Sequence, residues 1–148
     1  MENAMEQKVV YVGFWARVLA SVIDTICFSL VLVPLAIMYY GTEYFVAGRD
    51  IGIAGRIVFY GLPAVAVIIF WLARGATPGK MVIGALVVDA ATLGKLGTGQ
   101  AILRYVGYYV STIPLLLGLI WVGFDSRKQG WHDKIAGTLV IKASKGGA

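Results

Sequence analysis

Cysteine and histidine are almost absent from this sequence of 148 residues, which contains only Cys27 and His132. A single cysteine forms no disulfide within the chain, and the two residues together supply too few ligands for a four-ligand zinc site. Their spacing also offers no pair of nucleophile and general base. We therefore expect no metal site, no cofactor and no enzymatic activity.

Charged residues are scarce as well, at 14% of the chain against about 25% in an average soluble domain. Hydrophobic residues make up 59%, and the mean hydropathy is +0.79. A soluble domain of this size needs more polar residues to cover its surface, so the composition indicates an integral protein of the lipid bilayer. The net charge of +5 fits Lys and Arg in cytoplasmic loops, and we expect no nucleic-acid partner.

Three uncharged runs are long enough to cross a bilayer: Thr25–Thr42, Ile57–Ala73 and Tyr105–Phe124. A bilayer core requires about 20 helical residues, with about 17 as the minimum. When Asp24 is allowed inside it, the first run predicts a spanning helix over Phe14–Tyr39. The third run contains Pro114 and Gly118, which weaken a helix at that point.

The distribution of lysine and arginine predicts the orientation, because cytoplasmic loops are enriched in both. If the third run crosses the bilayer, the two sides carry six and seven of these residues; if it is re-entrant, they carry eleven and two. The second distribution is the positive-inside pattern. We therefore predict an all-α membrane protein with two transmembrane helices, a re-entrant third segment and both termini in the cytoplasm. A third full crossing is the alternative.

Two short segments rich in β-branched residues predict strands, at Lys80–Asp89 and Gly137–Lys142. Isolated strands gain most by pairing with each other, which requires that both lie on the same side of the membrane. A small cytoplasmic strand pair therefore agrees with a re-entrant third segment. We treat residues 1–148 as one domain and predict disorder at residues 1–10 and 143–148.

The segment GATPGKM (Gly75–Met81) superficially resembles a phosphate-binding loop. Such a loop needs four residues between its glycines and a Ser or Thr after the lysine, and this segment has neither. We interpret it as a turn after the second helix, with Pro78 and Gly79 fixing the backbone and Lys80 at the lipid headgroups.

Arg17 and Asp24 place opposite charges within the first predicted helix. Seven residues make nearly two full turns, so both lie on one helix face about 10.5 Å apart along the axis, with Ser21 between them. Arg17 can extend to the interface, whereas a carboxylate in a span costs up to about 2.5–3.5 kcal/mol. Asp24 is therefore either a titratable site on an ion path or a contact between helices. In the second case we expect it to bond a hydroxyl, such as that of Tyr60, Tyr108 or Thr112.

The segment Asp125–Thr138 carries five charged residues just after the third run. Most of these charges are typical of a solvated loop beside the membrane, where Arg127 and Lys128 are positioned to contact anionic headgroups. Asp133 differs, because the following KIAGT turns back toward apolar surface. His132 is interpreted as a loop residue, with a proton relay as the alternative.

Four blocks of the sequence resemble the RDD family of small bacterial membrane proteins: GFWARVLASVIDTI, TPGKMVIGALVVD, QAILRY and RKQGWHDKIAGTLVIK. The resemblance covers about residues 10–142, and the family takes its name from one arginine and two aspartates. It assigns these to Arg17, Asp24 and Asp133, with Asp125 as a less favoured candidate. It also implies the inner membrane of a bacterium and a role in transport, with cation/proton exchange proposed for some members.

We expect a transporter or channel for a small ion or solute, with Asp24 as the titratable or cation-binding group. Asp133 and Arg17 would form a cytoplasmic gate or charge relay, and the supporting residues would be Ser21, Asp125, Arg127 and His132. The alternative is a structural or adaptor subunit in which the Arg/Asp set holds the fold together. Because two or three helices enclose little volume, we expect a homo-oligomer with a solute path between protomers.

Overall fold

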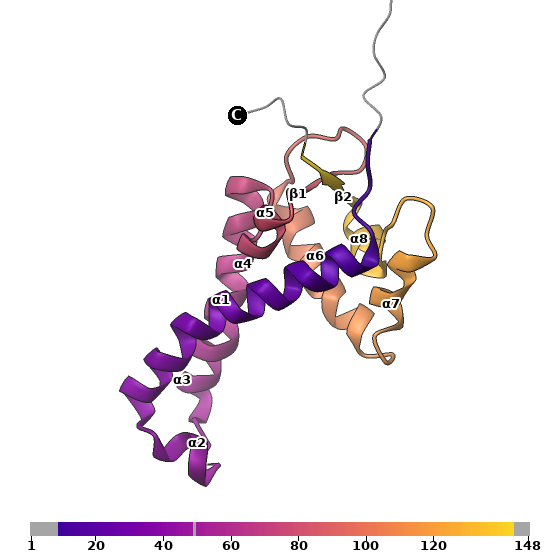
Figure 1. Cartoon of the computed structure of the whole chain (residues 1–148). Helices are drawn as coiled ribbons and strands as arrows, with labels where there is room; N and C mark the ends of the chain where they lie inside the picture. Colours follow the sequence, from indigo (N-terminus) through magenta and orange to yellow (C-terminus); the bar gives the residue numbers. More distant parts are fainter. Residues whose placement is uncertain (1–8, 49, 144–148) are drawn as a thin grey trace, which may run out of the picture.

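The structure is a computed structural model that describes residues 9–48 and 50–143 (Figure 1). The predicted disordered ends lie largely outside these residues. Two residues of those ends that are described are hydrogen-bonded: the Lys142 amide donates to the Val10 carbonyl, and the Ala143 amide donates to the Gly84 carbonyl, both at 2.8 Å.

Two helical stretches of the described chain are long and apolar enough to cross a membrane. The first is α1 (Phe14–Tyr40), which ends at Gly41 with a φ of 74° that favours glycine. The second runs over 31 residues, Gly52–Val82. It is built from α3 (Gly52–Arg56), the π-helical turn η1 (Ile57–Gly61), α4 (Leu62–Arg74) and α5 (Pro78–Val82). The π turn ends two residues before Pro63, whose missing N–H interrupts the regular helical bonding. The short helix α2 (Glu43–Ala47) lies between the two stretches.

The third apolar run forms two helices rather than one. Helix α6 (Thr98–Thr112) is followed by α7 (Leu117–Ile120) and the 3-10 turn η2 (Trp121–Gly123), and the chain bends by 112° between them. The predicted break near Pro114 is therefore confirmed. Leu115 and Leu116 have φ values of 54° and 65°, which an L residue in a continuous helix does not adopt.

The predicted strand pair is confirmed. Strands β1 (Ala85–Asp89) and β2 (Thr138–Lys142) pair antiparallel, from Ala85 opposite Lys142 to Asp89 opposite Thr138. The first strand begins at Ala85 rather than at Lys80, because residues 78–82 belong to α5. Tyr11 adds a bridge to Ile141, so the segment before α1 lies along the outer side of β2.

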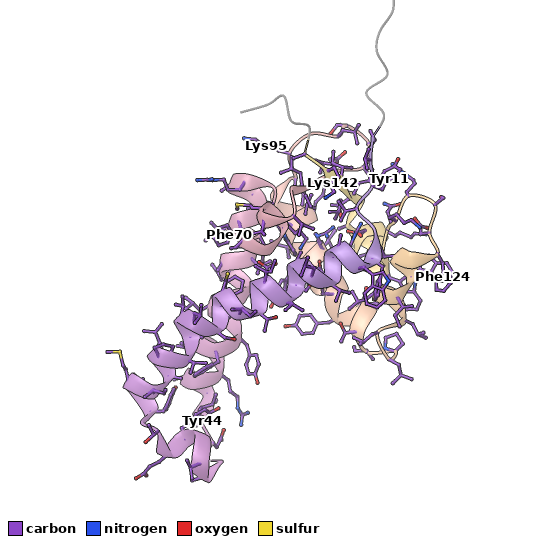
Figure 2. The ribbon with its side chains drawn as sticks, viewed as in Figure 1. Tyr11, Tyr44, Phe70, Lys95, Phe124 and Lys142 are labelled. Carbon is purple, nitrogen blue, oxygen red and sulfur yellow. The ribbon has the colours of Figure 1, made fainter. Side chains whose placement is uncertain are left out.

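The sheet, the start of α1 and helix α8 (Trp131–Ala136) gather at one end of the molecule, and α2 lies at the other (Figure 1). Figure 2 shows Tyr11 and Lys142 at the sheet end and Tyr44 at the opposite end. The buried apolar cluster is at the sheet end and contains Val12, Trp71, Ala85, Val87, Leu96, Ala101 and Val140. By contrast, large side chains along α1 are about half exposed or more, among them Leu19, Val22, Ile26 and Leu30. A surface this apolar is unfavourable in water, which supports a membrane location.

Candidate functional site

Asp133 is the centre of a buried charge cluster. It is the third residue of α8, and its Oδ2 accepts a hydrogen bond from the Gly130 amide at 3.0 Å. Arg17 Nη1 lies 2.5 Å from the same oxygen, while Arg104 Nη1 donates to Oδ1. The carboxylate is fully buried between these two guanidinium groups. We call Arg17, Arg104 and Asp133 the Asp133 cluster.

Both arginines of the Asp133 cluster are fixed by further contacts. Arg17 donates to the Val12 carbonyl at 3.0 Å and to the Lys128 carbonyl. Arg104 donates to Thr138 Oγ1 at 2.6 Å, and its guanidinium lies over the Trp71 ring at 5.2 Å. The cluster therefore joins α1, α6, α8 and β2 at the sheet end.

The charges of the Asp133 cluster do not balance. Burial alone would raise the pKa of Asp133, but the guanidinium groups of Arg104 and Arg17 outweigh it and hold this pKa well below its usual range. Burial lowers the pKa of His132 to about 3, with Asp133 acting against the shift. His132 is therefore neutral at pH 7 and stacks on Tyr108 with ring centroids 4.1 Å apart. The cluster carries two cations and one anion.

Asp24 belongs to a different site. Thr77 Oγ1 donates to Asp24 Oδ2 at 2.6 Å, and the Gly79 amide donates to Oδ1 at 2.7 Å. The carboxylate thus binds the first turn of α5, where a negative charge is favourable. A hydroxyl does bond Asp24, as expected for a contact between helices, but it belongs to Thr77 in the turn after α4 and not to Tyr60, Tyr108 or Thr112.

Gly79 permits this contact between α1 and α5. A Cβ atom added at Gly79 would lie 2.0 Å from the Ala20 carbonyl oxygen, closer than any side chain tolerates. Ala20 itself is fully buried. Ser21, expected between Arg17 and Asp24, instead donates to the Arg17 carbonyl of its own helix at 3.0 Å.

Asp24 lines a groove of about 800 Å³ between α1, α4 and α6, which we call the polar groove. Hydroxyl groups form much of its wall, from Ser21, Thr25, Ser29, Tyr60, Thr77, Tyr105, Tyr108, Tyr109 and Thr112. Beside it, a second cavity of about 430 Å³ lies between α1, α7 and α8, and we call it the α1–α7 cavity. Ser21, Thr25, Lys80 and Tyr108 line both.

Lys80 is buried within the protein instead of lying at its surface as a loop cation. Only 6% of the residue is exposed, because α5 packs against α1 and turns the side chain toward the two cavities. The side chain lines the polar groove together with Asp24 and the α1–α7 cavity together with Leu119 of α7.

The remaining predicted residues of the loop before α8 stabilise a turn. Asp125 Oδ1 pairs with Lys134 at 2.6 Å, and this contact holds the pKa of Asp125 below its usual value. Arg127 is exposed and donates to the Ala90 carbonyl at 3.3 Å. Neither side chain contacts the Asp133 cluster. Among the residues that the structure describes, no group of three or more His, Cys, Asp or Glu is placed to hold a metal ion.

The sequence analysis missed Arg104, the second partner of Asp133. A signal was present, because Ala101, Arg104 and Ser111 follow the spacing of one helix face, and small residues on that face indicate close packing. Thr77 and Lys80 were missed as site residues because both stand in a segment that reads as a simple turn. The structure therefore separates the predicted trio: it joins Arg17 to Asp133 and places Asp24 elsewhere.

The model of the RDD family matches residues 11–137. The chain is 33% identical over 140 residues to the uncharacterized membrane protein YteJ of Bacillus subtilis, covering 88% of this chain and 80% of that protein. It is 42% identical over 76 residues to the uncharacterized protein RP437 of Rickettsia prowazekii, covering 51% of this chain and 42% of that one.

A longer relative is the proline-rich antigen of Mycobacterium leprae, which is 27% identical over 150 residues. The match covers 86% of this chain, and the chain spans 60% of the length of the antigen and 42% of that of RP437. No solved structure matches this chain. The apolar helices and the relative YteJ indicate a membrane location. With the family model matching residues 11–137, the chain belongs to the RDD family.

Proposed function

We propose that this protein carries a small ion or solute across the bacterial inner membrane, with Asp24 as the ion-binding group. The observation that carries this proposal is the position of Asp24 in the wall of the polar groove, among many hydroxyl groups. A carboxylate within a spanning helix is costly and normally has a functional partner. Hydroxyl and carboxylate oxygens are also the ligands that hard cations and protons require.

In this proposal, Asp24 couples ion binding to the packing of the second span. Its two oxygens hold Thr77 and Gly79 of the α5 turn against α1. A proton or cation that binds the carboxylate weakens both hydrogen bonds, since it neutralises the negative charge that strengthens them. Occupancy at Asp24 then loosens α5 and opens the groove toward the sheet end.

The Asp133 cluster would form the closed cytoplasmic end of this path. Its carboxylate is buried and held by two guanidinium groups, so its charge stays fixed. It would hold α1, α6 and α8 together while α5 moves. A re-entrant α6–α7 hairpin would place this cluster and the sheet on the cytoplasmic side. Two or three helices enclose little volume, which favours a homo-oligomer in which a second copy completes the path.

Proton flux in liposomes tests the proposal. Purified protein is reconstituted with an internal pH-sensitive dye, and a gradient of Na⁺ or K⁺ is applied to wild type, Asp24→Asn and Asp50→Asn. Asp50 is a matched control, because it is an exposed carboxylate remote from the groove. We expect cation-dependent flux in wild type and Asp50→Asn and at least a tenfold loss in Asp24→Asn. Equal flux in all three proteins would refute a role of Asp24 in transport.

A second candidate function is a structural or adaptor subunit of the membrane. The observation that favours it is that both oxygens of Asp24 already have partners within the fold, at 2.6 and 2.7 Å. Asp24 and the Asp133 cluster would then hold α1 to the rest of the fold at two positions. This function requires that wild type produces no flux above empty liposomes and that Asp24→Asn lowers the melting temperature in detergent.

A further inference from the structure

We propose that the α1–α7 cavity binds a membrane phospholipid with an anionic headgroup, and that Lys80 contacts its phosphate. This site goes beyond the transport path, because it lies in the neighbouring cavity and needs no transported ion. It also differs from surface attraction by loop cations, since the binding group is inside the protein.

Lys80 is the first reason for this assignment. It is nine-tenths buried and its side chain lines the α1–α7 cavity. Across residues 9–48 and 50–143, its ammonium group has no hydrogen-bond partner and no carboxylate within salt-bridge distance. Among the described residues, the fully enclosed and unpaired side-chain atoms do not include the Lys80 nitrogen, so its ammonium group is open to the cavities, where an anionic oxygen can pair with it.

The charge of the cavity selects the sign of the ligand. Its lining includes Arg17 and Lys80, and none of the described residues that line it is an aspartate or glutamate. His132, which also lines it, is neutral at pH 7. The polar groove differs because it contains Asp24, which repels an anion. An anionic ligand therefore favours the α1–α7 cavity over the groove, although Lys80 faces both.

The remainder of the wall favours a lipid over a free anion. The cavity is lined by apolar side chains of α1 and of the α7 region: Val18, Val22, Ile26, Leu116, Leu119 and Ile120. Several of these are also on the molecular surface, since Val22 is 50% exposed and Ile26 is 54% exposed. The cavity thus has a cation, Lys80, at one position and an apolar wall that continues onto the surface of α1. A phospholipid has this same sequence of a charged phosphate and an acyl chain.

Native mass spectrometry of the delipidated protein tests the site. Phosphatidylglycerol and phosphatidylcholine are added to the full chain in detergent, for wild type, Lys80→Met, Lys80→Arg and Lys95→Met. Lys95 is the control, because it is exposed and outside the cavity. We expect wild type to prefer phosphatidylglycerol by about fivefold, as one lysine near an anionic lipid provides. Lys80→Met removes the preference, whereas Lys80→Arg and Lys95→Met keep it.

Two results overturn the proposal. One is an undiminished preference for phosphatidylglycerol in Lys80→Met. The other is displacement of the lipid by glycerol 3-phosphate or inorganic phosphate at equal concentration, which would mean a site for free anions. If Lys80→Met does not fold, Val22→Trp replaces it: the indole fills the apolar wall, and we expect loss of bound phosphatidylglycerol, while retained binding refutes the site. The assay uses no ion gradient, so its outcome is independent of the flux measurement.

Discussion

Replacing Asp133 with asparagine removes the negative charge of the Asp133 cluster while nearly preserving its shape. Arg104 is fully buried, and the Arg17 side chain is 11% exposed, so neither guanidinium can turn to solvent without rearranging the fold. The variant therefore leaves two cations buried beside each other without a counter-charge. We expect it to be among the most destabilising single changes in this chain.

The magnitude follows from the behaviour of buried ion pairs. Removing one partner of such a pair costs about 3–5 kcal/mol, because the remaining charge is buried without compensation. For a chain of this length, that corresponds to a fall in Tm of about 10–20 °C. Arg17→Met gives a smaller fall, because Arg104 and Asp133 then remain as a balanced pair. The net charge of the cluster in each variant thus predicts which variant has the lower Tm, as well as the size of the decrease.

Thermal unfolding in detergent, followed by tryptophan fluorescence, measures both effects. Trp71 is a suitable reporter, since it is buried beneath the Arg104 guanidinium. Asp50→Asn serves as the control: its ion pair with Arg56 has side chains 67% and 59% exposed, so its loss should not move Tm beyond experimental error. If Asp133→Asn melts with wild type, or if Arg17→Met melts at a lower temperature than Asp133→Asn, the reasoning from charge balance is refuted.

Two further perturbations test other parts of the fold. Burial lowers the pKa of His132 from 6.5 to about 3, so the unfolded chain binds more protons between these values and stability falls as the pH decreases from 6.5 toward 3. His132→Phe keeps an aromatic ring against Tyr108, and the free energy of unfolding should then depend less on pH in this window. An unchanged pH dependence would mean that other groups cause it. Gly79→Ala forces a methyl group against the Ala20 carbonyl and should cost about 1–3 kcal/mol, whereas Gly99→Ala meets no atom within 4 Å and should be neutral or slightly stabilising. Equal melting temperatures of the two alanine variants would contradict the close packing of α5 on α1.

The two long apolar helices and the strand pair could be predicted because each has a strong periodic or compositional signal. Residues 14–40 lack charge except at Arg17 and Asp24, and the β-branched segments of β1 and β2 pair with each other. The boundary of β1 could not be predicted. Val82 and Ile83 suit a strand as well as a helix, and only the packing of α5 on α1 determines where the helix ends.

The candidate site was only partly predictable for a similar reason. Helical spacing correctly places Arg17 and Asp24 near one face of α1, but it gives no information about which neighbour lies at each level of the helix. Arg17 lies level with α8 and Asp24 lies level with α5, so two residues seven apart have separate partners. Arg104 was missed because its identity as the partner of Asp133 depends on the contact between α6 and α8, which is a tertiary feature.

The pairing of Arg17 with Asp133 also constrains the order in which the protein matures during synthesis. Thr77, the partner of Asp24, is synthesised 53 residues after it, whereas Asp133, the partner of Arg17, follows only after 116 residues. At about 5–20 residues per second, the synthesis of these residues takes roughly 6–23 s, during which Arg17 is already translated and Asp133 is not. Its long side chain can remain at the membrane surface in that time. The ion pair between Arg17 and Asp133 is therefore among the last contacts of α1 to form, and a chain stopped before α8 would contain Arg17 and Arg104 without their shared carboxylate.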